Sequence, residues 1–370
     1  AFNKQEQEKE KFAEENPVSK SNTKEEEPVM NNVVLGRTGI EVRKQSFGCL
    51  PIQRLSKAEA VKLLRQAAEG GMNFFDTARA YTDSEEKVGE AFKGIRHKLI
   101  IATKTGAQTA EEMWKDLETS LKNLQTDYID IYQFHNPSFC PKPGGADGLY
   151  EAALKAREQG KIRHISITNH RLAVAHEAID SGLYDTLQFP FSYLSGPKEM
   201  ELVEKCKQAD MGFIAMKAMA GGLIRDGFTA AAFMEECPTV VPIWGVQHDW
   251  ELAQFLSCLN EAPAMTPERK AAIEKDRKDL AGDFCRGCGY CMPCPVGIEI
   301  NSCARMTLML RRAPSAGWLS DKWQNEMHKI ENCLHCNQCS SKCPYGLNTP
   351  KLLEENYKEY WDILEESKRS

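Results

Sequence analysis

The 370-residue sequence contains no run of about 18 consecutive apolar residues, which is the length that a membrane-spanning helix requires. Its first residues also lack the basic patch, the apolar core and the small-residue cleavage site of a secretion signal. The formal net charge is -6, so there is no basic excess to favour nucleic acid. We therefore expect no membrane and no nucleic-acid partner. We also expect a cytoplasmic location, with export as the alternative because the chain begins at Ala1 rather than methionine and an upstream signal could have been removed.

No G-x-G-x-x-G sequence follows any predicted strand, which argues against an open dinucleotide-binding sheet. The chain instead carries eight short apolar runs separated by amphipathic segments with helical period. Eight such strand and helix units over roughly 230 residues match the size of a (β/α)8 or TIM barrel. The runs cover residues 45–50, 72–78, 98–104, 127–135, 162–168, 186–190, 212–217 and 239–245. The predicted fold class is therefore α/β.

The sequence divides into three parts. Residues 1–32 are rich in Glu, Lys, Asn and Ser and have too little apolar area to offset the entropy of ordering, so we predict a flexible N-terminal extension. Residues 33–265 hold the predicted barrel. Residues 266–370 form a predicted C-terminal domain, with a connecting helix near 267–280 and an amphipathic closing helix after residue 350.

Polar side chains stand at the ends of three successive predicted strands. Asp76 and Tyr81 follow the second strand, Lys104 ends the third and His135 ends the fourth. Because functional residues of such barrels lie at the carboxyl ends of the strands, these four side chains should converge over the barrel mouth. A single histidine or lysine there would more often be a surface residue, but four in consecutive units indicate a site.

The stretches "NFFDTARAY", "IIATKTG", "IYQFH" and "ISITNHR" resemble the aldo-keto reductase family, from about Val33 to Leu259. The resemblance implies that NADP(H) or NAD(H) binds directly on the barrel and that the substrate is a small carbonyl compound or alcohol. It implies catalytic roles for Asp76, Tyr81, Lys104 and His135. It implies cofactor contacts from Thr168, Asn169, Gln188, Lys217 and Gly245.

The residue types suggest how the four catalytic candidates act. The Lys104 ammonium should lower the pKa of the Tyr81 phenol and make it a usable general acid, while Asp76 keeps the lysine charged. A neutral His135 can donate a hydrogen bond to the substrate carbonyl oxygen as negative charge grows on it.

One region departs from the family pattern. Gln254 and Phe255 stand where Glu-Asn is expected against an adenine, and only His248 is a candidate for a 2′-phosphate contact. The preference between NADP and NAD therefore stays open. A repacking of this region against the C-terminal domain would explain the change equally well.

Nine of the 14 cysteines crowd between Cys285 and Cys343. The later run fits the bacterial ferredoxin spacing C-x2-C-x2-C-x3-C-P, and the earlier run has one residue fewer before its last cysteine. Four-cysteine zinc sites are the alternative, but these use two separated pairs. We predict two 4Fe-4S clusters in a ferredoxin-like dicluster domain, each with three cysteines of one run and the last of the other. The predicted groups are Cys285, Cys288, Cys291 and Cys343, and Cys294, Cys333, Cys336 and Cys339.

Together these features predict an NAD(P)H-dependent oxidoreductase that reduces an aldehyde or ketone, or runs the reverse reaction. The clusters would serve electron transfer or redox sensing, which implies a redox partner protein. A dicluster module of this layout resembles one found in a branch of bacterial aldo-keto reductases. No flavin-binding signature is evident to convert the two electrons of a hydride into single electrons. The alternative is an iron-sulfur electron-transfer protein that uses the barrel as a scaffold with little or no nicotinamide chemistry.

Overall fold

The computed structural model of the chain describes residues 31–280, 284–312 and 317–369. The predicted N-terminal extension therefore lies outside the described residues except for its last two positions. By their contacts, residues 31–370 group as one unit. The proposed division into two domains near residue 265 stays a prediction.

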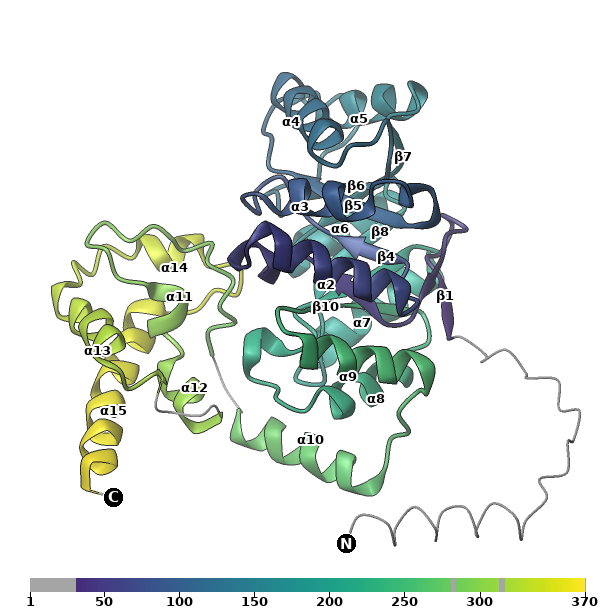
Figure 1. The fold of residues 1–370 in the computed structure, drawn as a ribbon. Helices are drawn as coiled ribbons and strands as arrows, with labels where there is room; N and C mark the ends of the chain where they lie inside the picture. Colours follow the sequence, from purple (N-terminus) through teal and green to yellow (C-terminus); the bar gives the residue numbers. More distant parts are fainter. Residues whose placement is uncertain (1–30, 281–283, 313–316, 370) are drawn as a thin grey trace, which may run out of the picture. The chain divides into compact units, whose positions relative to one another are not determined.

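Eight parallel strands form a closed barrel in the order β10-β3-β4-β5-β6-β7-β8-β9 (Figure 1). Each predicted apolar run contains one of these strands, so the predicted TIM barrel is confirmed. The strands are β3 (Ser46–Gly48), β4 (Phe74–Asp76), β5 (Ile100–Thr105), β6 (Ile129–His135), β7 (Ile162–Thr168), β8 (Thr186–Pro190), β9 (Gly212–Met216) and β10 (Val240–Gly245).

Eight α-helices follow the strands and surround the barrel (Figure 1). Helix α2 illustrates why they form: Ser56 caps its first turn in a capping box with Glu59, and its apolar stripe is buried against the strands. These helices are α2 (Lys57–Glu69), α3 (Ser84–Phe92), α4 (Ala110–Asn123), α5 (Leu149–Glu158), α6 (Leu172–Ser181), α7 (Pro197–Gln208), α8 (Gly227–Glu235) and α9 (Asp249–Asn260). Short 3-10 turns are η1 (Pro51–Arg54), η2 (Arg96–Lys98) and η3 (Ala220–Gly222).

An antiparallel hairpin of β1 (Asn32–Val34) and β2 (Glu41–Arg43) precedes the barrel. Its Val33 and Val42 are buried in one cluster with Phe74, Ile131 and Ile214. Since Phe74 is the first residue of its strand, the hairpin covers the end of the barrel opposite to the strand ends that carry the polar side chains. The hairpin does not cover the other end, the barrel mouth, and a ligand can enter there.

The C-terminal part is helical and has a hydrophobic core of its own, which includes Ile298, Met306, Leu353 and Tyr360. Its first and last helices confirm the predicted connecting and closing helices. The helices are α10 (Pro267–Asp279), α11 (Ile300–Cys303), α12 (Met306–Arg312), α13 (Asp321–His328), the 3-10 turn η5 (Lys329–Asn332), α14 (Gln338–Lys342) and α15 (Thr349–Arg369). A smaller cluster of Leu223, Leu280 and Met309 joins a barrel loop to helix α12.

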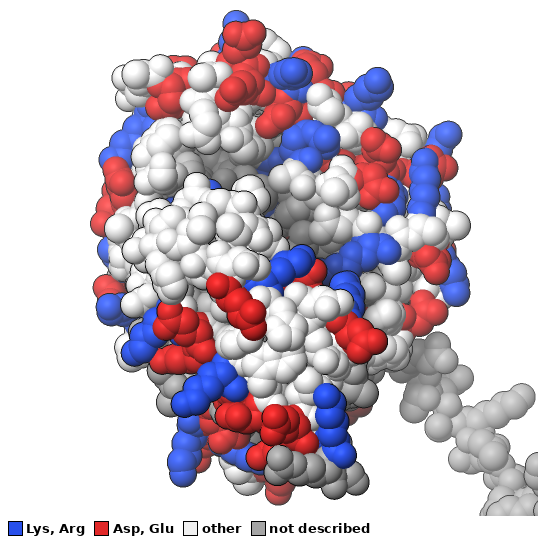
Figure 2. All heavy atoms as spheres, turned by 90° about the vertical axis from the view of Figure 1, so that its left-hand side faces the viewer, with Lys and Arg blue, Asp and Glu red and all other residues white. Residues whose placement is uncertain are grey.

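Acidic and basic side chains are interspersed on the face drawn in Figure 2, and neither sign forms a continuous field there. Within the described part of the chain, no helix has both the length and the apolarity needed to cross a lipid bilayer.

Candidate functional site

Asp76, Lys104 and His135 lie at the carboxyl ends of the neighbouring strands β4, β5 and β6. Strand pairing places Asp76 beside Ala102 and Lys104 beside Gln133, so all three side chains belong to the same end of the barrel. The structure therefore brings the predicted strand-end residues together at the mouth.

Asp76 and Lys104 form a buried ion pair. Lys104 Nζ donates to Asp76 Oδ2 at 2.5 Å and to the Thr77 carbonyl oxygen at 2.7 Å. The Asp76 and Lys104 side chains are only 2% and 1% exposed, so water does not solvate these charges and each is stabilised by the other. Gln133 Nε2 donates to the other carboxylate oxygen at 2.9 Å, and Gln188 Nε2 approaches Oδ2 at 3.4 Å. Asp76 is thus fixed by three side chains from three strands.

Tyr81 closes the group from the loop between β4 and α3. Lys104 Nζ lies 4.9 Å from the centroid of the Tyr81 ring. The Tyr81 and His135 rings meet edge to face with centroids 5.9 Å apart. A phenol, an ammonium group and an imidazole therefore converge on one region of the mouth.

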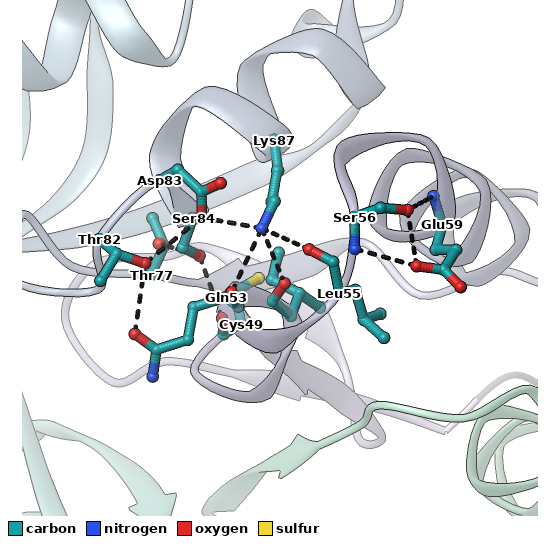
Figure 3. A network of polar contacts seen from close by, with 11 residues as sticks. Cys49, Gln53, Leu55, Ser56, Glu59, Thr77, Thr82, Asp83, Ser84 and Lys87 are labelled. Carbon is teal, nitrogen blue, oxygen red and sulfur yellow. Dashed lines mark hydrogen bonds and ion pairs between the residues drawn. The ribbon is translucent and has the colours of Figure 1, made fainter.

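Hydrogen bonds fix the loop that carries Tyr81 (Figure 3). The Thr77 and Ser84 hydroxyls are 2.9 Å apart, and Ser84 Oγ donates to the Cys49 carbonyl oxygen at 3.0 Å. In α3, the buried Lys87 donates to the carbonyl oxygen of Leu55 at 2.8 Å and to Asp83 Oδ1 at 2.8 Å. Both ends of the loop are therefore held against the segment after β3.

The surroundings of Tyr81 correct one expectation. Burial raises the pKa of the Tyr81 phenol well above its ordinary value, and the Asp76 carboxylate raises it further. The prediction that this phenol is more acidic than usual is wrong for this structure, because the net shift of its pKa is upward and burial is its largest cause. Tyr81 stays protonated, which is the form that a proton donor needs. Burial, together with the Lys104 charge, lowers the pKa of His135 to about 3, so the imidazole is neutral as expected.

Thr168 and Asn169, two of the predicted cofactor contacts, are hydrogen-bonded to the loops that follow β6 and β7. Asn169 Oδ1 accepts from the backbone amides of His170 at 3.0 Å and Arg171 at 2.8 Å, and its Nδ2 donates to the Pro137 carbonyl oxygen at 2.8 Å. Thr168 Oγ1 accepts from the backbone amide of residue 136 at 3.0 Å. Asn169 Oδ1 thus accepts two hydrogen bonds, while its Nδ2 keeps one hydrogen to donate and the Thr168 hydroxyl keeps its own.

The two barrel glutamines have an open acceptor each. Gln188 Oε1 and Gln133 Oε1 are buried and have no hydrogen-bond partner among the described residues. An unsatisfied buried acceptor costs about 1–3 kcal/mol, so a ligand donor at this position would be stabilised. Gly245, another predicted cofactor contact, is the last residue of β10 and is exposed.

The region that departs from the family pattern packs on the barrel. Phe255 is 3% exposed and stacks on Trp244 of β10, with ring centroids 4.3 Å apart and planes 9° apart. Phe255 therefore packs on the barrel, in one cluster that also contains Ile273 of α10. His248 stacks on Trp250, which is 66% exposed.

The first cysteine run lies in the loop between α10 and α11. Cys285 and Cys291 are buried, and the Gly287 backbone amide donates to Cys285 Sγ at 3.4 Å. Burial raises the pKa of Cys285, and the nearby Cys288 and Cys343 raise it further, although Gly287 and Arg305 act in the opposite sense. Cys343, the last cysteine of the second run, therefore lies within electrostatic reach of the first run.

The second run surrounds a pocket of about 390 Å³. The thiols at its wall are Cys291, Cys294, Cys333, Cys336 and Cys339, and most of the remaining lining is apolar. Burial raises the pKa of Cys339, to which Cys333 and Cys336 contribute. A 4Fe-4S cluster takes four thiolate ligands, and the pocket offers five thiols, Cys291 among them, so the residues fit such a group.

A single metal ion does not fit these loops equally well. Within residues 31–280, 284–312 and 317–369, no three His, Cys, Asp or Glu side chains are arranged to hold one ion. A zinc ion needs its sulfur ligands at about 2.3 Å from one atom, whereas the irons of a cubane lie at separate corners.

Aromatic residues beside the cysteines reach the barrel mouth. His170, which directly follows Asn169, is 3% exposed, and its Nδ1 lies 2.6 Å from the Tyr345 hydroxyl. The His170 ring also meets the Tyr290 ring edge to face, with centroids 4.9 Å apart. Burial raises the pKa of Tyr290, and the nearby Tyr81 raises it further. The cysteine loops therefore contact the same end of the barrel as the strand-end residues.

Lys217, a further predicted cofactor contact, faces the first cysteine run. Its pKa is lowered by burial and by Arg305, while Cys288 and Cys285 act to raise it. It also lines a pocket of about 440 Å³ between the loop after β8 and the residues Phe284, Arg286 and Tyr345. Lys217 thus lies at the boundary between barrel and cysteine loops, where it can meet either a ligand or a cluster.

Several of these residues were not predicted, although some left a signal. Gln133 lies two positions before His135, so strand alternation points both side chains to the same face. Tyr290 and Tyr345 stand next to cysteines of the two runs, which marks them as residues close to any cluster. His170 and Arg305 left no comparable signal.

Comparison with known proteins gives two family matches. Residues 44–240 match the model of the aldo/keto reductase family, and residues 284–348 match that of a 4Fe-4S dicluster domain. The second match contains all eight cysteines of the two runs. It supports 4Fe-4S clusters in the C-terminal part.

Among curated proteins, an L-galactose dehydrogenase of Arabidopsis thaliana is 30% identical over 211 residues, covering 52% of this chain and 66% of that protein. An uncharacterized oxidoreductase of Bacillus subtilis is 28% identical over 206 residues, again covering 52% of this chain and 66% of that protein. The match thus spans just under two thirds of the length of these relatives.

Among solved structures, the holo form of an aldo-keto reductase from Bacillus halodurans has a TM-score of 0.59 at 23% identity, covering 67% of this chain and 96% of that chain. An aldo-keto reductase from Klebsiella pneumoniae in complex with NADPH has a TM-score of 0.55 at 23% identity, covering 67% and 95%. At these identities the likeness shows the fold alone.

Proposed function

The chain belongs to the aldo/keto reductase family, and from that premise we propose that it is an oxidoreductase that reduces a small aldehyde or ketone in the barrel mouth, or oxidises the corresponding alcohol. The observation that carries the proposal is the convergence of Tyr81, His135 and the ion pair of Asp76 with Lys104. These groups provide a proton donor, a neutral hydrogen-bond donor and a fixed positive charge around one point.

Each side chain has a distinct task in the reduction. The protonated Tyr81 hydroxyl gives its proton to the carbonyl oxygen as negative charge develops there. Neutral His135 donates to the same oxygen and orients it, because an imidazole whose pKa is about 3 does not carry a charge at neutral pH. Lys104, held in place by Asp76, lies beside the Tyr81 ring, and its positive charge stabilises the negative charge that grows on the carbonyl oxygen.

NADP(H) or NAD(H) is the proposed hydride carrier, as in the relatives whose structures contain NADPH. A nicotinamide bound at the mouth would supply the hydride to the carbonyl carbon. The open Gln188 acceptor suits the amino group of its carboxamide, and the Thr168 hydroxyl has a hydrogen to donate. Asn169 Nδ2 has one hydrogen left to donate beside its bond to the Pro137 carbonyl oxygen, and the pattern at Gln254 and Phe255 leaves no preference between the two carriers.

We assign the cysteine ligands as follows, and name the clusters by their distance from the barrel. The proximal cluster is held by Cys285, Cys288, Cys291 and Cys343, and the distal cluster by Cys294, Cys333, Cys336 and Cys339. The mutual influence of Cys285, Cys288 and Cys343 supports the first group. The pocket lined by the other four thiols supports the second. The clusters would exchange single electrons with a redox partner protein, or serve redox sensing.

Replacing Tyr81 with phenylalanine tests the catalytic assignment. We expect carbonyl reduction with NADPH or NADH to fall by about 10²–10⁴-fold in kcat, because only the general acid is lost. Nicotinamide affinity, measured by fluorescence quenching, should change less than threefold. Tyr150→Phe, which removes a hydroxyl bonded to the Leu183 carbonyl oxygen, is the matched control and should keep its turnover. Wild-type turnover in Tyr81→Phe would remove this residue from the mechanism.

The second candidate is an iron-sulfur electron-transfer protein that uses the barrel as a binding scaffold. It is favoured by the position of Lys217, a predicted cofactor contact, beside the first cysteine run. The anaerobically purified protein separates the two proposals. If the reductase assignment is right, NADPH or NADH quenches the protein fluorescence with saturation below the millimolar range. An absence of saturable binding for both carriers, with clusters present, would support the scaffold instead.

A further inference from the structure

Arg305 connects the barrel to the first cysteine run. Its Nη1 donates to the Gly221 carbonyl oxygen, in the loop after β9, at 2.8 Å. Its guanidinium also lies flat against Gly287, where an added Cβ would stand 2.6 Å from Arg305 Cζ. Gly287 separates Cys285 from Cys288 and has a left-handed backbone with φ of 63°. The guanidinium is therefore wedged between a barrel loop and two cysteines of one run.

Lys217 is a second cation at the same place, on the barrel side. The charged neighbours that act on Lys217 are Cys288, Arg305 and Cys285. Those that act on Arg305 are Cys285 and Cys288. Among the described residues, neither cation has an ion pair with a carboxylate, in contrast to Lys104 with its aspartate. Among the described residues, the acidic groups that act on both cations are the thiols of Cys285 and Cys288 in the first run.

Two partly buried cations without a carboxylate are unfavourable unless another negative group is close. Arg305 Nε is also buried and has no acceptor among the described residues. A cluster held by four thiolates supplies both a negative charge and sulfur acceptors. The position of Arg305 is thus explained by a cluster next to it better than by the protein groups alone.

We propose that Arg305, together with Lys217, is a positioning residue that raises the reduction potential of the proximal cluster. This inference rests on the ligand groups proposed above. Reduction adds one electron to the cluster and forms or breaks no bond, so the cluster becomes more negative. Cations held at fixed positions stabilise that extra charge, because net charge and hydrogen bonds to sulfur set the potential of such clusters.

The distal cluster differs from the proximal cluster in its exposure to water. Its Cys336 is exposed, and the nearby Leu334 is 65% exposed, so water reaches its loop. Solvent exposure and nearby fixed charges act separately on the potentials of the two clusters.

A potentiometric titration followed by electron paramagnetic resonance tests the proposal on the anaerobically purified full chain. In Arg305→Met, the ratio of reduced to oxidised proximal cluster at a fixed potential should fall at least tenfold, which is 59 mV for a one-electron couple. The signal of the distal cluster should stay in place. Arg305→Lys keeps the charge and should retain most of the wild-type potential. Lys351→Met removes a lysine that is 67% exposed and should change neither cluster.

The outcomes separate this proposal from the ligand assignment. Iron and sulfide analysis is done first: a wild-type protein without clusters would overturn the proposed function itself. If both clusters are present and Arg305→Met titrates like the wild type, the role of Arg305 is refuted while the function stands. If Arg305→Met loses iron, Lys217→Met is titrated instead. A lowered potential of one cluster in that variant supports the proposal, and an unchanged potential overturns it.

Discussion

Replacing Lys104 with methionine is expected to lower kcat for carbonyl reduction by about 10²–10⁴-fold, the range of a lost general acid or base contribution. The reason is that Lys104 Nζ holds Asp76 at 2.5 Å and lies 4.9 Å from the Tyr81 ring centroid, so its loss removes the positive charge from the mouth. Breaking a buried ion pair by removing one partner also costs about 3–5 kcal/mol of stability. The Gln133 and Gln188 amides still donate to the carboxylate and should keep this cost near the lower limit.

The measurement combines steady-state kinetics with thermal unfolding. Lys44→Met is the matched control, since Lys44 is also buried and donates to the carbonyl oxygens of Cys237 and Val240, at the start of β10 and so away from the mouth. It should lose stability to a similar extent and keep its turnover per folded molecule. If both variants lose turnover equally, Lys104 acts only through stability and the proposed site is wrong.

Two double variants are expected to show that each cluster takes its ligands from both cysteine runs. Cys285→Ser with Cys343→Ser should leave one cluster per chain, because both residues are assigned to the proximal cluster. Cys285→Ser with Cys339→Ser should leave none, because each cluster then lacks one thiolate ligand. The difference amounts to about four iron atoms per chain, since each 4Fe-4S cluster contains that number.

Iron and acid-labile sulfide per chain, with the visible absorption, measure the result after anaerobic reconstitution. Cys303→Ser is the control, because Cys303 is buried in α11 and its nearest hydrogen-bond partner is the Glu326 carbonyl oxygen at 3.9 Å. It should keep both clusters. If the first double variant contains no iron and the second retains one cluster, the cysteines are grouped differently from our assignment.

The elements that could be predicted from the sequence are those marked by a short pattern of neighbouring residues. Each barrel strand is marked by a short apolar run, and the residue that ends it is fixed along the chain, so Asp76, Lys104 and His135 could be assigned to one end of the barrel. The short hairpin of β1 and β2 was missed because its strands have three residues each, too few for a period to show.

The cysteine runs are equally local, because spacings of three residues on one loop direct the thiols to one region. Which cysteine joins which cluster depends on the path of the 38 residues between Cys294 and Cys333. The proximity of Cys343 to Cys285 is therefore a property of the folded chain.

The sequence by itself thus determined the barrel, the convergence at its mouth and the cluster motifs, because all three follow from short-range periodicity and spacing. Only the tertiary structure decided the protonated state of Tyr81, the engagement of Asn169 and the contact of His170 with Tyr345. The last pair is 175 residues apart in the chain. Burial and charge at such places are sums over side chains brought together by folding, so no local pattern could have revealed them.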